Sequence, residues 1–124
     1  MPTWNELKIE SKSSAGELFK RKYYRSSVSR SYYAAYAAIT SALLSKGSVV
    51  FLSSKEGPAH TDVTRRYDYS LLLKLPSKKC DRIKSALNKL YGLRIVADYR
   101  PSAEVTSGEA RMALALMNNI IVEI

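Results

Sequence analysis

One segment, residues 26–46, constrains the fold of this chain more than any other. Alanines favour a helix here and allow neighbouring helices to approach closely, and Gly47 directly afterwards is a typical helix stop. Seven apolar residues recur at steps of three and four and would form one face of a long helix: Val28, Tyr32, Ala35, Tyr36, Ile39, Ala42 and Leu43. Such a face must be covered by other elements.

Helical signals also dominate the rest of the chain. A first helix is expected from Thr3 to about Lys20–Lys22. A third would run from Pro58, a residue favoured in the first turn, to about Lys74. Its apolar face would hold Val63, Tyr67 and Leu71. Residues 49–52 would fit a strand, but no second strand lies nearby, and we predict a loop there.

Two more helices complete the pattern. Ser77 would cap a fourth helix, which ends towards Tyr99 because Pro101 disfavours helix at the residue before it. Thr106 and Glu109 have the spacing of a capping box and open a last helix. We therefore predict an all-α fold, an antiparallel bundle of four or five helices in a single domain of residues 1–124.

The net charge of the chain limits the kinds of partner that it is expected to bind. Twenty Lys and Arg against eleven Asp and Glu give a formal charge of +9, with basic clusters at residues 20–30 and 74–94. These clusters are either solvated faces or a surface for an RNA backbone, and both interpretations are open. The longest uncharged stretch, residues 31–45, is shorter than the roughly 20 residues of a membrane-spanning helix. We expect a cytoplasmic protein with no membrane partner.

Several kinds of chemistry are excluded. Cys80 is the only cysteine, which rules out an internal disulfide and a cysteine-based zinc site. The glycines lack the spacing of a phosphate-binding loop. We predict no metal and no cofactor. His60 is the only histidine, so a catalytic histidine would have to be His60.

Arg94 stands out because it continues the apolar stripe of the predicted fourth helix. A buried arginine must be bonded or must face a partner. Asp98 lies four residues later, on the same helix face. Two interpretations remain: an ion pair that locks Arg94 to Asp98 or to a tyrosine of residues 26–46, or an arginine that binds phosphate in a cleft or at a dimer seam.

Two stretches resemble HEPN domains. Residues 29–38, SRSYYAAYAA, resemble the second helix of that family, and residues 93–99, LRIVADY, resemble the Arg-x-x-Ala-Asp-Tyr motif of its fourth helix. His60 and residues 106–110 lie where the family has its third and last helices. The chain is similar to small stand-alone HEPN proteins of the kind paired with nucleotidyltransferases. The resemblance implies an antiparallel bundle that forms homodimers and acts in a toxin–antitoxin or defence-type system.

The resemblance also implies a chemistry. In active members an Arg and a His of each copy meet at the dimer interface and cleave RNA without a metal. Here Arg94 matches that Arg, but the residue five positions later is Tyr99. We therefore expect a protein that binds RNA, a nucleotide or a nucleotidyltransferase through an Arg/Tyr cleft at the homodimer interface. The residues expected to bind are Arg94, Arg30, Arg25 and Tyr33.

Two further hypotheses remain. The alternative is an active metal-independent endoribonuclease toxin, in which Arg94 and its neighbour Asp98 act with Tyr99 or His60. A less supported hypothesis is nucleotidyl transfer to Tyr99, because modified members carry that tyrosine at a position occupied here by Pro101.

Overall fold

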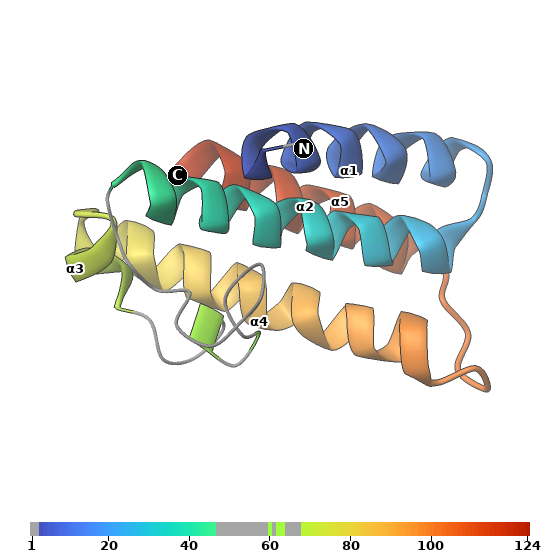
Figure 1. Ribbon diagram of the computed structural model, residues 1–124. Coiled ribbons are helices and arrows are strands. Elements are labelled where there is room, and N and C mark those ends of the chain that lie inside the picture. Colours follow the sequence, from blue (N-terminus) through green and yellow to red (C-terminus); the bar gives the residue numbers. More distant parts are fainter. Residues whose placement is uncertain (1–2, 47–59, 61, 64–67) are drawn as a thin grey trace.

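The computed structural model describes residues 3–46, 60, 62–63 and 68–124. Its helices are α1 (Trp4–Lys20), α2 (Tyr24–Ser45), α3 (Tyr69–Leu72), α4 (Ser77–Tyr99) and α5 (Ser107–Glu123). Figure 1 shows α2 between α1 and α4, with α5 passing behind α2. The predicted all-α helical bundle is confirmed.

The centre of the bundle is α2. It contacts α1, α4 and α5, and twelve of its 22 residues are buried. Of the predicted apolar face, only Ala42 is partly exposed. Burial extends beyond that face to Ala34, Ala37 and Ala38, because three helices surround α2 and the small side chains let them approach.

Three helix starts can be compared with the predictions. The Thr3 hydroxyl accepts a hydrogen bond from the Glu6 amide at 3.1 Å, and the Thr106 hydroxyl accepts one from the Glu109 amide at 3.2 Å. Both are complete capping boxes. The prediction that Ser77 caps α4 is wrong. Pro76 adopts the extended cap conformation (ψ 149°), so Ser77 is already the first helical residue and makes no cap hydrogen bond.

The predicted third helix is also wrong in its C-terminal part. Among the described residues of that region, Asp68 is not helical and α3 covers only four residues. Lys74 has a φ of 57°, a left-handed conformation that cannot continue a helix. Val63 is buried as expected, whereas Tyr67 and the predicted loop at residues 49–52 lie outside the described residues. Within the described part of the chain, no helix has the length and hydropathy to cross a membrane.

Candidate functional site

Arg94 occupies the seam between α4 and α2. Only 8% of it is exposed. Its Nε donates to Asp98 Oδ2 at 2.9 Å, and its Nη2 donates to the hydroxyls of Tyr33 at 2.9 Å and Tyr99 at 3.4 Å. The guanidinium carbon also lies 5.2–5.6 Å from the ring centroids of Tyr99, Tyr33 and Tyr32. A carboxylate, two hydroxyls and three aromatic rings thus surround one buried cation.

These contacts keep Arg94 charged. Burial alone would lower its pKa, but Tyr33, Tyr99 and Asp98 outweigh that effect and raise the pKa above its ordinary value. In the described residues, Nη1 of Arg94 makes no hydrogen bond. The seam therefore holds a permanent positive charge with donors still available for an anion.

His60 joins the same site from outside α4. Its Nδ1 lies 2.7 Å from the hydroxyl of Tyr32, and its ring is 4.9 Å from that of Tyr36. Burial, with the nearby charge of Arg94, lowers the pKa of His60. Burial also raises the pKa of Tyr32, so both groups are neutral near pH 7. One tyrosine thus connects His60 to Arg94.

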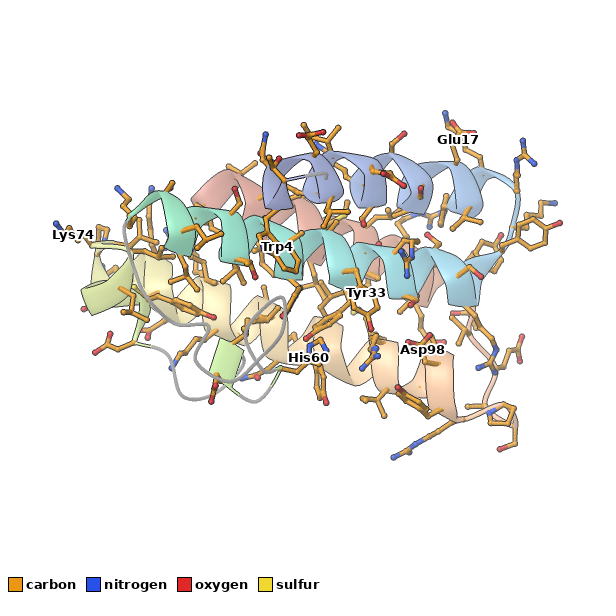
Figure 2. All side chains as sticks on the ribbon, in the orientation of Figure 1. Trp4, Glu17, Tyr33, His60, Lys74 and Asp98 are labelled. Carbon is orange, nitrogen blue, oxygen red and sulfur yellow. The ribbon has the colours of Figure 1, made fainter. Side chains whose placement is uncertain are left out.

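We call the group formed by Arg94, Asp98, Tyr99, Tyr32, Tyr33 and His60 the Arg94 cluster. Figure 2 shows Tyr33, His60 and Asp98 along the seam between α2 and α4. All four residues that the sequence suggested for catalysis, Arg94, Asp98, Tyr99 and His60, belong to the cluster.

The cluster opens to solvent at one side. Tyr99, the last residue of α4, is 64% exposed. The exposed Arg30 stacks on the outer side of the cluster, with its guanidinium carbon 5.1 Å from the Tyr33 ring centroid. Ser29 donates to Asp98 Oδ2 at 3.3 Å. A buried cation, an exposed ring and a second, exposed cation therefore lie next to one another, a combination that suits a phosphate and an unpaired base.

Arg25 has a different place. Its Nη1 donates to the carbonyls of Val96, Ala97 and Arg100 at 3.0–3.2 Å. Its Nη2 donates to the carbonyls of Pro101 and Ala103. Arg25 thus satisfies the C-terminal end of α4 and the following turn, and the structure does not bring it into the Arg94 cluster.

Two of the residues at this site were not predicted from the sequence. Tyr32 had been assigned only to the apolar face of its helix, and Ser29 had no role. Two signals pointed towards Tyr32: a buried tyrosine hydroxyl needs a partner, and a tyrosine of residues 26–46 was one expected partner of Arg94. Among the described residues, no group of three or more His, Cys, Asp or Glu could hold a metal.

Comparison with known proteins gives one result. The family model described as HEPN domain matches residues 9–124. Neither the curated proteins nor the solved structures gave a match.

Proposed function

Because the chain belongs to the HEPN domain family, we propose that it is a homodimeric protein that binds RNA through the Arg94 cluster. The proposal is carried by one observation, the charged Arg94 held among tyrosines with Nη1 available. That nitrogen suits a phosphate oxygen, the exposed Tyr99 ring suits an unpaired base, and Arg30 adds a second cation.

The family supports a wider setting for this binding. We place the protein in a toxin–antitoxin or defence-type system of the cytoplasm, with a nucleotidyltransferase as a partner protein. A nucleotide would use the same contacts as RNA, since it also offers a phosphate and a base.

Retardation of a fluorescein-labelled single-stranded RNA at low salt, with EDTA present, tests the proposal. We expect Arg94→Ala to weaken binding about tenfold and Arg30→Ala about threefold, because each removes a phosphate contact. Arg30 is exposed, so its replacement leaves the core intact. Arg21→Ala, which also removes one exposed arginine but lies outside the cluster, is the matched control. Equal binding by all three variants would overturn the proposal.

A second candidate function is a metal-independent endoribonuclease. The observation that favours it is the Tyr32–His60 contact, which brings the only histidine to the Arg94 cluster. Arg94 would stabilise charge on the phosphate, and His60 or Tyr99 would assist proton transfer at the ribose 2′-hydroxyl. The neutral form of His60 near pH 7 suits a proton acceptor.

The same RNA assay separates the two functions. RNA that is retarded but uncut in EDTA supports binding alone. RNA that is cut in EDTA would instead support the endoribonuclease, provided that cleavage is lost in both Arg94→Ala and His60→Gln. Circular dichroism must show that both variants are folded.

A further inference from the structure

The solvent-facing side of α5 is uncharged along most of the helix and carries apolar residues between polar ones. From Met112 to Val122 the chain has no charged residue, although 25% of its residues are charged. Met112 is 53% exposed and Val122 is 81% exposed, and between them Ala115 and Asn119 are also exposed at helical spacing. Single exposed apolar residues are ordinary, and what distinguishes this stripe is the absence of charge over eleven consecutive residues.

A groove flanks α5 on each side. One of about 640 Å³ lies between α4 and α5, with Ile83, Ile120 and Val122 in its lining. The other, of about 490 Å³, lies between α1 and α5 and is lined in part by Ile9 and Ile121. We call the stripe and its two grooves the α5 face.

Exposed apolar side chains concentrate on the α5 face. Six large hydrophobic residues of the described chain are strongly exposed, and Ile9, Met112 and Val122 are three of them. The grooves give these side chains recesses beside them, so the face has the relief that a partner helix needs.

The border of the α5 face is basic. Lys8 and Lys12 line the groove beside α1, and Lys89 lines the groove beside α4. Within the described part of the chain, none of these three lysines has an ion-pair partner.

The acidic residues of the two grooves are mostly neutralised. Glu17 lies 3.7 Å from Lys20, and Glu123 lies 2.9 Å from Arg82. Asp81 is the one groove carboxylate of the described residues outside such a pair. The surface is therefore apolar in the middle and positive at its border.

We infer that the α5 face binds an amphipathic helix of another protein, whose apolar side enters the grooves and whose flanks are acidic. Charge selects this occupant, because acidic flanks complement the free lysines. A second copy of this chain would bring the same net positive border and repel it. None of the Arg94 cluster residues lines these grooves, so the inference goes beyond RNA binding.

Two synthetic helical peptides test the inference. Both are fluorescein-labelled and carry the same leucine stripe, flanked by glutamates in one and by lysines in the other. In fluorescence anisotropy we expect the glutamate peptide to bind and the lysine peptide to bind at least about tenfold more weakly. Val122→Asp and Ile9→Asp should each weaken binding of the glutamate peptide about tenfold, because each places a carboxylate in the apolar contact.

Leu44→Asp is the matched control. Leu44 is also apolar and 43% exposed, but it lies outside both grooves, and this variant should bind the peptide normally. A Lys8→Glu, Lys12→Glu double variant should reverse the preference towards the lysine peptide. Circular dichroism and RNA retardation should be unchanged in all of them.

Three results would overturn the inference. Equal binding of the two peptides would show that charge does not select the partner. Normal binding by both aspartate variants would show that the peptide does not bind at the α5 face. Self-association in sedimentation velocity that disappears in Val122→Asp would show that a second copy covers the face.

Discussion

At the scale of single residues, Arg94 depends on its guanidinium geometry as well as on its charge. The Nε and Nη2 groups reach Asp98, one turn away on α4, and Tyr33 on α2, so two helices share one side chain. A lysine would keep the charge but could not direct fixed donors to both partners. The contacts that join α2 to α4 thus also fix the orientation of the guanidinium.

The pH dependence of stability should report on His60. Its pKa in the folded protein is lowered by burial and by Arg94, so the unfolded chain takes up the proton at a higher pH, near the ordinary value of about 6.5. As the pH falls below about 6.5, the unfolded state gains this proton and the free energy of unfolding decreases. Above that pH the stabilising contribution is fully present. Chemical denaturation at about pH 7.5 and about pH 5.5 measures the decrease.

His60→Gln is the control for this decrease. Glutamine does not titrate, so the variant should lose less stability than the unsubstituted protein between the two pH values. An equal loss in both proteins would contradict the assignment, since the carboxylates would then account for all of it.

At the scale of elements, the end of α4 is expected to depend on Arg25. Five carbonyls of α4 and the following turn accept hydrogen bonds from this one guanidinium. Hydrogen bonds to a charged group contribute more than neutral ones, so Arg25→Ala should lower the free energy of unfolding by about 2 kcal/mol. Arg21→Ala, at an exposed position, should change it by less than about 0.5 kcal/mol. Chemical denaturation of the two variants measures both values, and equal stability would show that the carbonyls do not need Arg25.

Elements with local signals were predictable from the sequence. The capping box at Thr106 involves residues three apart and was predicted, and α1 begins directly after Thr3, as expected. Ser77 failed because the backbone conformation of Pro76, which a residue list does not give, decides where α4 starts. The helix expected from Pro58 to about Lys74 is not continuous because Asp68 is not helical, and the apolar period of the sequence does not show this break.

At the site, too, contacts within one helix were predictable from the sequence and contacts between distant residues were not. The apolar stripe of α4 predicted a buried Arg94, and four-residue spacing predicted its pair with Asp98. Tyr33 and His60 are 61 and 34 residues away from Arg94 in the chain, so their contacts depend on how the helices pack. For Arg25, charge alone suggested RNA, whereas its carbonyl partners lie more than 70 residues later.

At the scale of the whole molecule, the basic residues divide into different tasks. Arg25 is engaged with backbone carbonyls, Arg82 with Glu123 and Arg94 with its cluster. The acidic partners of Arg82 and Arg94 are already subtracted in the formal charge of +9, so the excess of basic residues can attract an anion at long range. Arg30 lies at the opening of the Arg94 cluster, and Lys8, Lys12 and Lys89 line the α5 face.

The proposed homodimer gives a prediction for the whole molecule that distinguishes the Arg94 cluster from the α5 face. If the Arg/Tyr cleft forms the dimer seam, light scattering should give a dimer at micromolar concentration. Tyr99→Arg should then shift the protein to monomer, because symmetry places the new cation in the seam twice, each time beside Arg94. Val122→Asp, on the α5 face, should leave the dimer intact. A monomeric unsubstituted protein would contradict a cleft built from two copies. A dimer that is lost only in Val122→Asp would show that the dimer interface lies at α5.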